Sequence, residues 1–490
     1  MLCKTLPRIN WPSLERGRAS RSTGCRSAAA FPKIAASLAK FQHARRRFEI
    51  KYQSDRFLLV DDYAHHPTEI RATLATARSA GRKRVLTMFQ PHRYSRTKAL
   101  QREFGGAFDD ADHVVITDVY PASEAALPGI SGQTIADAIL RHGHRAVSYQ
   151  PRLDRLHGDL GQMLAEGDLV LSLGAGNIHE QLAKLAAELV IAERLKEIVG
   201  PAGDVRLAEP LAKHTTLRVG GPAQFWVEPR SEEAFAGLIR FCRRENLPLF
   251  VIGRGSNLLV RDGGIRGVVV HPSGGEFDKV ESLGVEVTAG VGAKLKQIAY
   301  AGKAAGIGGV EWMEGIPGAV GGALRMNAGA MGAQTFDRVV RVRYLDREGV
   351  AHEKTPNEME VHYRHVPALA ENFAVSAVFR GAKCSAEEIV RRLDESQEKR
   401  RATQPSAKSA GCIFKNPNAC PAGKLVDELG LKNSGVGDAR VSKVHGNFIV
   451  NEGAATAGDI LELIGRIQAT ARKKRGIELE TEVQIVGEEG

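Results

Sequence analysis

Two glycine-rich stretches have the residue types needed to hold a phosphate group. GRGSNLL spans residues 253–259 directly after an expected strand over 248–252, and GIPGAVGG spans residues 315–322. Glycine lets backbone amides approach a pyrophosphate closely, so the amides donate hydrogen bonds without a positive side chain. Neither stretch has the GxGxxG or GxxxxGK(S/T) spacing of the common nucleotide loops, so each alone is equally compatible with an ordinary turn.

Three other side chains have properties that suit charge stabilisation and proton transfer. Arg364 keeps its proton at any ordinary pH, Cys412 carries an ionisable thiol, and Glu482 is a carboxylate near the C-terminus. Each also has a purely structural interpretation: a surface arginine, a small buried apolar residue, and a solvent-facing carboxylate in the alternating segment 477–483. Spacing alone favours the structural interpretation for all three.

A group of acids and histidines in the N-terminal part raises the question of a metal site. Asp61, Asp62, His65 and His66 lie close together in the sequence. A metal site needs further ligands and a supporting shell of hydrogen bonds, so this spacing is a weak signal. We predict no metal site here.

The elements that would position these residues belong to two fold classes. In residues 51–190, buried apolar strands alternate with helices, which predicts an α/β domain with a parallel sheet covered on both faces. Strands are expected over 84–89, 113–119 and 168–173, and helices over 97–108 and 179–189. The last helix continues to Val199, where Gly200 and Pro201 stop it.

From Gly200 onward, glycine is frequent and short alternating strands stand between separate helices, which is an α+β pattern. Helices are expected over 231–246, 387–401 and 456–474, and strands over 340–344 and 477–486. Thr456 and Asp459 have the spacing of an N-terminal cap for the last helix, and Gly476 has the position of its C-terminal cap.

Ordered motifs across residues 200–490 resemble those of the UDP-N-acetylenolpyruvoylglucosamine reductases, the MurB family. They are TTLRVGGP (215–222), GRGSNLL (253–259), GIPGAVGG with NAGA (315–330), YR (363–364), GCIFKNP (411–417), HGNFIVN (445–451) and the segment 480–483. The resemblance implies an α+β FAD-binding domain of the PCMH type over 200–384. It also implies a substrate-binding domain over 385–490.

The same resemblance implies an activity: FAD-dependent, NADPH-consuming reduction of UDP-N-acetylglucosamine enolpyruvate to UDP-N-acetylmuramate in peptidoglycan precursor synthesis. In the family pattern, Arg364 and Glu482 stabilise the charge that develops on the substrate, and the residue at position 412 protonates a carbon. The family usually has serine where this chain has Cys412. A thiol of pKa ~8.5 is mostly protonated at neutral pH, so we interpret Cys412 as a working replacement. A pKa depressed by Arg364 would instead leave an inert thiolate.

The resemblance also assigns binding residues. Those matched to the FAD-binding segments are Arg218, Gly253, Gly255, Ser256, Asn257, Leu258, Gly315, Ile316, Pro317, Gly318, Gly321 and Gly322. Those matched to substrate binding are Tyr363, Lys415 and Asn416.

Three motifs within residues 34–195 resemble the C-terminal domain of the UDP-N-acetylmuramate–L-alanine ligases, which implies a Rossmann-like α/β fold. They are DDYAHHPTE (61–69), FQPHRYSRT (89–97) and GAGNI (174–178). That family needs an ATPase domain with a GxxxxGK(S/T) loop, and this sequence contains no such loop. We therefore expect no independent ligase activity. The part is interpreted as the remnant of a ligase–reductase fusion, a truncated gene product, or a docking module for another peptidoglycan-precursor enzyme.

The net charge of +11 does not indicate nucleic-acid binding. Residues 1–50 hold 11 Lys/Arg and 2 Asp/Glu, so nearly all of the excess lies in a leader rather than on a folded face. Residues 1–33 are expected to be disordered. No apolar run reaches the length of a membrane helix, so no membrane insertion is expected. Six cysteines without a CxxC pair predict a reduced cytoplasmic protein.

Two alternatives stay open on the sequence alone. One is a different PCMH-type flavin oxidoreductase, which would have little use for the GCIFKNP motif. The other is a pathway scaffold whose ligase-like part binds partners and whose flavin half is inactive. Flavin absorbance and its bleaching by NADPH separate the scaffold from both enzymes.

Substitutions at Cys412 test its predicted role as proton donor. We expect Cys412→Ser to keep substantial turnover, because a hydroxyl can hold and deliver a proton, and Cys412→Ala to abolish it. The measurement is NADPH oxidation in the presence of the enolpyruvyl UDP-sugar. Full activity in the alanine variant would remove Cys412 from the mechanism.

Overall fold

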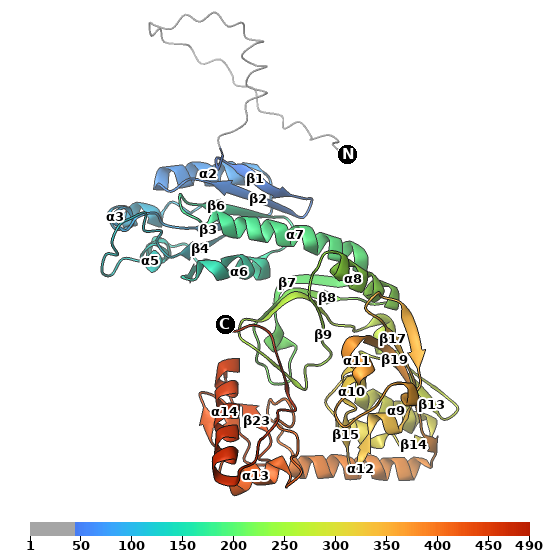
Figure 1. Ribbon diagram of the computed structural model, residues 1–490. Helices are drawn as coiled ribbons and strands as arrows, with labels where there is room; N and C mark the ends of the chain where they lie inside the picture. Colours follow the sequence, from blue (N-terminus) through green and yellow to red (C-terminus); the bar gives the residue numbers. More distant parts are fainter. Residues whose placement is uncertain (1–44) are drawn as a thin grey trace, which may run out of the picture.

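The computed structural model describes residues 45–490, which form two bodies joined by a long helix (Figure 1). The leader expected over 1–33, Cys3, Cys25 and the start of the ligase-like domain expected at residue 34 lie outside the described residues. Within the described part, Cys242, Cys384, Cys412 and Cys420 are free thiols.

The N-terminal body is a six-stranded sheet covered by helices. Its strands are β1 (Glu49–Gln53), β2 (Phe57–Asp62), β3 (Arg84–Phe89), β4 (His113–Thr117), β5 (Val147–Gln150) and β6 (Asp168–Leu173), in the order β1-β2-β6-β3-β4-β5. All neighbouring strands are parallel except β1 and β2. Every residue of β2 and β6 is buried, as strands with both faces covered require.

Helices cover both faces of this sheet, which confirms the predicted α/β class. Helices α2 (Pro67–Ser79) and α5 (Gly132–His142) pack on one face, and α6 (Leu156–Met163) and α7 (His179–Val199) pack on the other. The alternation along β2 divides the two cores, because Leu58 and Val60 point to the first and Phe57 and Leu59 to the second.

The prediction of a single helix over 97–108 is wrong. The structure has two short helices instead, α3 (Tyr94–Ala99) and α4 (Gln101–Gly105). Leu100 separates them because its backbone, with φ −104° and ψ 15°, leaves the helical region while its side chain packs against the core.

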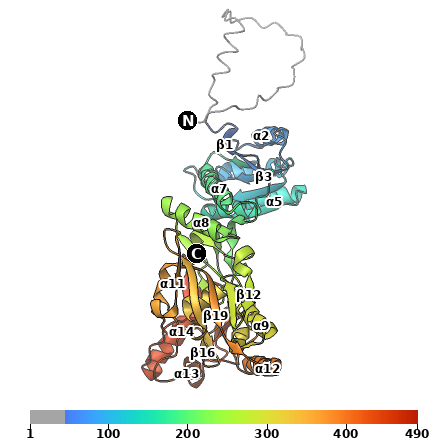
Figure 2. The same ribbon diagram turned by 90° about the vertical axis from the view of Figure 1, so that its right-hand side faces the viewer.

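Helix α7 belongs to both bodies. Leu182, Leu185 and Leu189 in its first half are buried in the N-terminal core, whereas Leu195 and Val199 near its end are buried in the core of the following domain. Figures 1 and 2 show the helix running from the sheet of the N-terminal body to α8 (Glu232–Arg244). The expected end of this helix at Val199 is confirmed.

The second body begins with two sheets. The first has the order β7-β8-β11-β9 and contains β7 (Asp204–Pro210), β8 (Pro222–Glu228), β9 (Leu249–Val251) and β11 (Ile265–Val270). The second is antiparallel, has the order β12-β13-β19-β17-β18, and contains β12 (Val280–Leu283), β13 (Glu286–Gly290), β17 (Val339–Leu345), β18 (Ala351–Lys354) and β19 (Phe373–Arg380). Helices α9 (Leu295–Ala305) and α10 (Val320–Met326) pack on the second sheet.

The C-terminal part forms its own core around α13 (Ala422–Glu428), α14 (Ala457–Arg475) and the small sheet β21 (Gly435–Val436), β22 (Ala439–Val441) and β23 (Ile449–Asn451). Helix α14 begins at a capping box of Thr456 and Asp459 and ends at Gly476 with φ 65°, as predicted. Helix α12 (Ala386–Thr403) packs instead on α9 through Ile389 and Leu393. The division of domains at residue 385 stays a prediction.

The prediction of a continuous strand over 477–486 is wrong for its first part. Only β24 (Gln484–Val486) is a regular strand, and it pairs in parallel with β10 (Leu258–Val260). The preceding residues run beside the segment 413–415 through a single bridge between Phe414 and Thr481. Within residues 45–490, every helix is too short or too polar to cross a lipid bilayer.

The double role of α7 can be tested by truncating a buried side chain near its end. Leu195→Ala removes a fully buried side chain, so we expect a loss of about 2–5 kcal/mol in the free energy of unfolding. Val190→Ala is the control, because Val190 lies on the same helix but is 45% exposed, and it should cost less than about 0.5 kcal/mol. Urea unfolding measures both, and equal midpoints for the two variants would contradict the assignment.

Candidate active site

Three residues that are far apart in the sequence meet in the second body. Nε of Arg364 donates a hydrogen bond of 2.9 Å to Oε1 of Glu482, and Nη1 of Arg364 donates to the carbonyl of Asn327 at 3.3 Å. The side chains of Arg364 and Glu482 are only 18% and 17% exposed. Cys412 lies close enough to both for their charges to act on its thiol. The expected grouping of the three residues is present.

Backbone pairing places Glu482 beside the segment that carries Cys412. The amide of Glu482 donates to the carbonyl of Ile413 at 2.8 Å, and the amide of Lys415 donates to the carbonyl of Glu480 at 2.9 Å. Nδ2 of Asn257 donates to the carbonyl of Glu482 at 3.1 Å. The GRGSNLL loop and the C-terminal segment are therefore held together at this point.

Asn447 fixes the backbone next to Cys412. Its carbonyl accepts from the amide of Ile413 at 2.8 Å. Its side-chain Oδ1 accepts from the amide of Phe414 at 2.9 Å, and its Nδ2 donates to the carbonyl of Phe414 at 2.8 Å. The residue is 3% exposed. The HGNFIVN motif alone did not indicate a role for Asn447; the signal was an amide side chain within a predominantly apolar run.

Arg364 is presented by an unusual backbone conformation. Its φ of 58° lies in the left-handed region, and the flanking residues His362 and His365 form a bridge with each other. Its guanidinium carbon lies 4.7 Å from the centre of the Tyr363 ring. A positive φ in a residue with a long side chain costs energy, so the surrounding structure must hold it.

The thiol of Cys412 is neutral at physiological pH. Burial raises its pKa to about 11, the Glu482 carboxylate adds to the increase, and the Arg364 cation and a hydrogen bond with Asn447 oppose it. The depressed pKa considered from the sequence does not occur, because desolvation of the thiolate outweighs the attraction of the arginine. A neutral thiol retains the proton that a donor needs.

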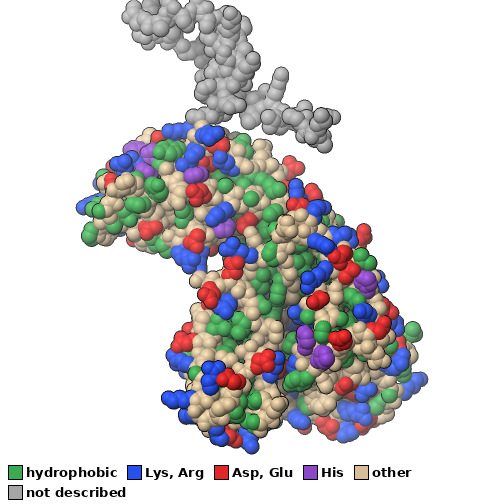
Figure 3. All heavy atoms as spheres, viewed as in Figure 1, with side chains coloured by type: hydrophobic (Ala, Val, Ile, Leu, Met, Phe, Trp, Pro, Cys, Tyr) green, Lys and Arg blue, Asp and Glu red, His purple; other side chains and the backbone are tan. Residues whose placement is uncertain are grey.

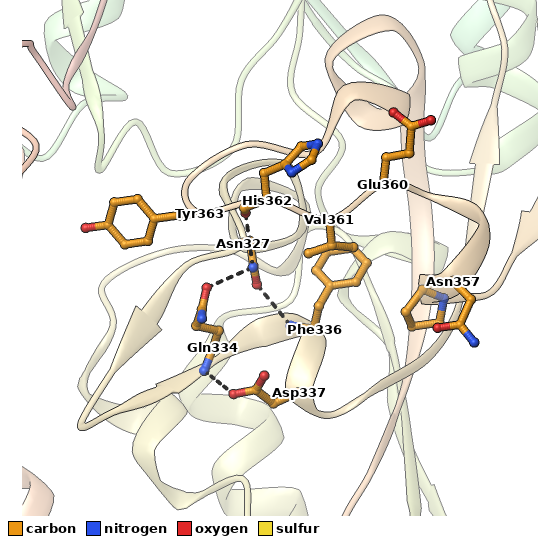
Figure 4. Close-up of a pocket in the computed structure, with 10 residues that line it drawn as sticks. Asn327, Gln334, Phe336, Asp337, Asn357, Glu360, Val361, His362 and Tyr363 are labelled. Atoms are coloured by element: carbon orange, nitrogen blue, oxygen red, sulfur yellow. Dashed lines mark hydrogen bonds between the residues drawn. The ribbon is translucent and has the colours of Figure 1, made fainter.

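A hollow of about 520 Å³ is lined by polar and aromatic side chains, among them Asn327, Gln334, Asp337 and Tyr363, the residue before Arg364. Figure 4 shows Asn327 between Gln334, His362 and Phe336: its Nδ2 donates to Oε1 of Gln334 at 2.9 Å and to the carbonyl of His362 at 3.3 Å. The amide of Phe336 donates to Oδ1 of Asn327 at 3.1 Å. Asn327 therefore holds the loop that carries Tyr363 and Arg364, a role that its place in the NAGA motif did not reveal.

The two glycine-rich stretches predicted to bind FAD lie against each other. A Cβ added at Gly318 would lie 3.6 Å from Oγ of Ser256, and one at Gly253 would lie 3.5 Å from Cβ of Ala319. A Cβ at Gly322 would meet no atom within 4 Å, so backbone is open to a ligand there. These stretches fit a pyrophosphate, because they offer backbone amides and free space together.

Other residues predicted to bind FAD have roles within the protein structure itself. Gly255 has φ 58°, and a Cβ there would lie 2.5 Å from the carbonyl of His214. A Cβ at Gly321 would lie 3.1 Å from Cβ of Val291, so this glycine packs closely on the sheet. Arg218 is exposed and donates from Nη1 to the carbonyl of Lys213 at 2.7 Å. The assignment of Ser256, Asn257, Leu258 and Gly315–Gly322 to FAD stays a prediction.

The residues predicted to contact substrate differ in whether their side chains already have partners within the protein. Tyr363 is 54% exposed at the edge of the hollow. Nζ of Lys415 is 2.7 Å from Oε1 of Glu480. Oδ1 of Asn416 accepts from the amide of Ala422 at 3.0 Å and so helps to begin α13. Figure 3, in the same view as Figure 1, shows that the surface is hollowed between the lobe that carries α14 and the lobe that carries α9 and α10.

The acids and histidines of the N-terminal body hold local structure. Asp61 pairs with Arg46 at 2.9 Å, Asp62 accepts from the amides of Phe48 and Ala64, and His66 caps α2. Among residues 45–490, no group of three or more His, Cys, Asp and Glu side chains has a geometry that could hold a metal ion.

Comparisons with known families match all three parts of the chain. Residues 223–354 match the FAD binding domain, and residues 404–486 match the C-terminal domain of UDP-N-acetylenolpyruvoylglucosamine reductase. Residues 46–176 match the glutamate ligase domain of the Mur ligases. The α+β flavin-binding class and the α/β class of the N-terminal body are thereby confirmed.

Individual relatives match the second body over nearly their whole length. The UDP-N-acetylenolpyruvoylglucosamine reductase of Pelobacter propionicus is 42% identical over 283 residues, which is 57% of this chain and 95% of the relative. The Bacillus subtilis enzyme of the same name is 40% identical over 300 residues, covering 61% and 98%. The crystal structure of the Thermus caldophilus enzyme is 36% identical, has a TM-score of 0.50, and covers 58% and 98%.

The opposing charges beside Cys412 make a prediction about its reactivity. Removing the carboxylate in Glu482→Gln should lower the pKa of the Cys412 thiol and speed its alkylation at a given pH. Removing the cation in Arg364→Gln should raise that pKa and slow alkylation. Iodoacetamide labelling between pH 7 and 10, read at Cys412 by peptide mass spectrometry, measures both.

Glu480→Gln is the matched control, because Glu480 lies two residues away in the same segment but is exposed and paired with Lys415. Its effect on the labelling of Cys412 should be small. Shifts in the same direction for Glu482→Gln and Arg364→Gln would contradict the proposed electrostatic balance.

Proposed function

The chain belongs to the UDP-N-acetylenolpyruvoylglucosamine reductases, and from this premise we propose that Arg364, Cys412 and Glu482 perform the chemistry of the reaction. The enzyme uses FAD and NADPH to reduce UDP-N-acetylglucosamine enolpyruvate to UDP-N-acetylmuramate, a step of peptidoglycan precursor synthesis. This assignment rests on one observation: the Arg364 cation, the Glu482 carboxylate and the neutral Cys412 thiol lie close together.

The bound flavin supplies the hydride that adds to the terminal carbon of the enolpyruvyl double bond. Gly253–Leu258 and Gly315–Gly322 would line that flavin, because their backbone is open and the two stretches are in contact. The protein around it must then stabilise the negative charge that spreads onto the substrate carboxylate, and it must deliver a proton to the neighbouring carbon.

Arg364 is the group that stabilises this charge. Nε and Nη1 are occupied by Glu482 and Asn327, whereas Nη2 donates to no group among the described residues and is available for the substrate carboxylate. A guanidinium held in place before the reaction need not reorganise as charge develops, which makes it more effective than a mobile cation. Tyr363 and the hollow beside it would contact the rest of the substrate.

Cys412 is the proton donor. Its S–H bond breaks as the C–H bond forms, and the resulting thiolate is stabilised by Arg364 until solvent returns a proton. Glu482 has two effects: it orients the guanidinium through Nε, and its negative charge helps to keep the thiol protonated beforehand. Lys415 and Asn416 are proposed to approach the phosphates or the sugar from the end of the same segment.

The ligase-like part is proposed to have no ligase activity of its own, because the sequence contains no GxxxxGK(S/T) loop. Its packing through α7 instead supports a structural contribution to the reductase. We place the reaction in the cytoplasm, where UDP-sugars and NADPH are found. Contact with other peptidoglycan-precursor enzymes stays a prediction.

Arg364→Lys tests the proposal on the full-length chain. Lysine keeps the charge but loses the fork that binds Glu482 and the substrate together, so kcat for NADPH oxidation should fall by about 100-fold or more. Bleaching of the flavin by NADPH alone should change little, because that half of the reaction does not involve the enolpyruvyl group.

Arg341→Lys is the control, because Arg341 is a surface arginine of β17 paired with Glu353. It should keep both half-reactions. A chain with no bound flavin, or one whose flavin is not bleached by NADPH, would favour the scaffold alternative. An Arg364→Lys variant with normal kcat would exclude Arg364 from the charge-stabilising role.

A further inference from the structure

The proposed chemistry uses no residue of the HGNFIVN motif, residues 445–451, although this motif lies beside the segment that carries Cys412. Its two asparagines, Asn447 and Asn451, are only 3% and 4% exposed. Amide side chains buried to this extent must find their hydrogen-bond partners inside the protein. The partners of these two differ, and the difference separates their roles.

The motif anchors the segment that carries Cys412 at both ends. On one side of Cys412, the backbone amide of Asn451 donates to the carbonyl of Lys408 at 2.9 Å. On the other side, the amide of Ile413 donates to the carbonyl of Asn447 at 2.8 Å. Only a few residues separate these two anchors, so the backbone at Cys412 has little freedom to move.

The chain turns between the anchors at Gly411, the residue before Cys412. Its φ of 74° lies in the left-handed region that favours glycine. A Cβ added at Gly411 would lie 3.9 Å from the carbonyl of Ser256. The turn therefore lies next to the GRGSNLL loop, where the flavin is proposed to bind.

The side chain of Asn447 reaches both the backbone and the thiol. Its Oδ1 accepts from the amide of Phe414 at 2.9 Å and its Nδ2 donates to the carbonyl of Phe414 at 2.8 Å, which uses one of its two N–H bonds. Burial raises the pKa of Cys412 to about 11, and the Glu482 carboxylate adds to the increase. The Arg364 cation and a hydrogen bond with the side chain of Asn447 lower it. A hydrogen bond that lowers the pKa favours the thiolate, so in this contact Asn447 is the donor.

Asn447 is itself held in place by its own loop. Its backbone amide donates to Nδ1 of His445 at 3.1 Å, so this nitrogen carries no proton. Oγ of Ser442 accepts from the amides of Val444 and His445 at 3.1 and 3.4 Å. The amide of Ser442 donates to the carbonyl of Phe448 at 2.8 Å and closes the loop. Such support is what a residue needs if it is to fix the geometry of a neighbour.

We propose that Asn447 is a positioning residue for proton transfer: it fixes Cys412 and donates a hydrogen bond to the sulfur as the thiolate forms. In that step the proton passes from sulfur to the substrate carbon, whose electron pair forms the C–H bond. The electron pair of the S–H bond stays on sulfur. The N–H group of Asn447 then stabilises the thiolate together with the Arg364 cation. The inference rests on the proposed role of Cys412 as proton donor.

A matched pair of isosteric substitutions tests the inference. Asn447→Asp keeps an oxygen for the amide of Phe414, but it replaces the N–H donor by an acceptor and adds a negative charge beside the sulfur. Asn451→Asp is the control. The side chain of Asn451 is buried to the same extent, donates to the carbonyl of Leu217 at 3.1 Å, and accepts from two backbone amides. Both variants thus lose one donor to a backbone carbonyl, but only one loses a donor to the sulfur.

The measurement separates the two half-reactions in the full-length, FAD-loaded protein by rapid anaerobic mixing. We expect flavin reoxidation by the enolpyruvyl UDP-sugar to slow by about tenfold or more in Asn447→Asp and by no more than about twofold in Asn451→Asp. Bleaching by NADPH should stay unchanged in both variants. The solvent deuterium isotope effect on reoxidation should increase only in Asn447→Asp, because proton transfer becomes the slower step there.

Three outcomes overturn the inference. Equal slowing in the two variants with an unchanged isotope effect would make the role of Asn447 purely structural. Slower bleaching in Asn447→Asp would place its effect on the flavin. If Asn447→Asp does not retain FAD, the neutral and smaller Asn447→Ser is measured in the same way, and an unchanged isotope effect there would also contradict the inference. Failure of the proposed function is distinguishable, because it would appear as full activity in Cys412→Ala, whatever the variants of Asn447 do.

Discussion

The ion pair between Arg364 and Glu482 is the interaction on which the proposed active site depends. It joins the loop between β18 and β19 of the second sheet to the segment just before β24, and it is largely withdrawn from solvent. Removing two charges from water is costly, and the attraction between them offsets this cost only where geometry is good and further hydrogen bonds are made. Asn327 supplies one such hydrogen bond to Arg364, and Asn257 holds the backbone of Glu482.

The same pair sets the protonation state of its neighbour. Cys412 lies in a buried place where a thiolate would be poorly solvated, next to one charge that favours the thiolate and one that disfavours it. Because burial dominates, the thiol stays neutral. A cysteine in this position therefore resembles a serine in one respect: its side chain carries a proton next to the cation of Arg364.

The ligase-like body and the reductase are joined by packing rather than by a flexible linker. Helix α7 contributes to the hydrophobic cores of both, and Leu207 of β7 contacts both cores as well. Because both cores include residues of α7, the free energies of unfolding of the two bodies are expected to be coupled. The N-terminal body can thus affect the reductase without any residue in its active site.

The sequence by itself determined the elements and the chemistry that are local. The spacing of apolar residues predicted α8 and α14, Thr456 and Gly476 marked the ends of the latter, and the ordered motifs identified the flavin-binding reductase fold. Only the tertiary structure decided the rest. The break at Leu100, the irregular path before Glu482, the clamp by Asn447 and the pKa of Cys412 all depend on contacts between segments far apart in the chain. Local propensity carries no information about such contacts, because burial and charge at a side chain are set by whichever distant residues fold against it.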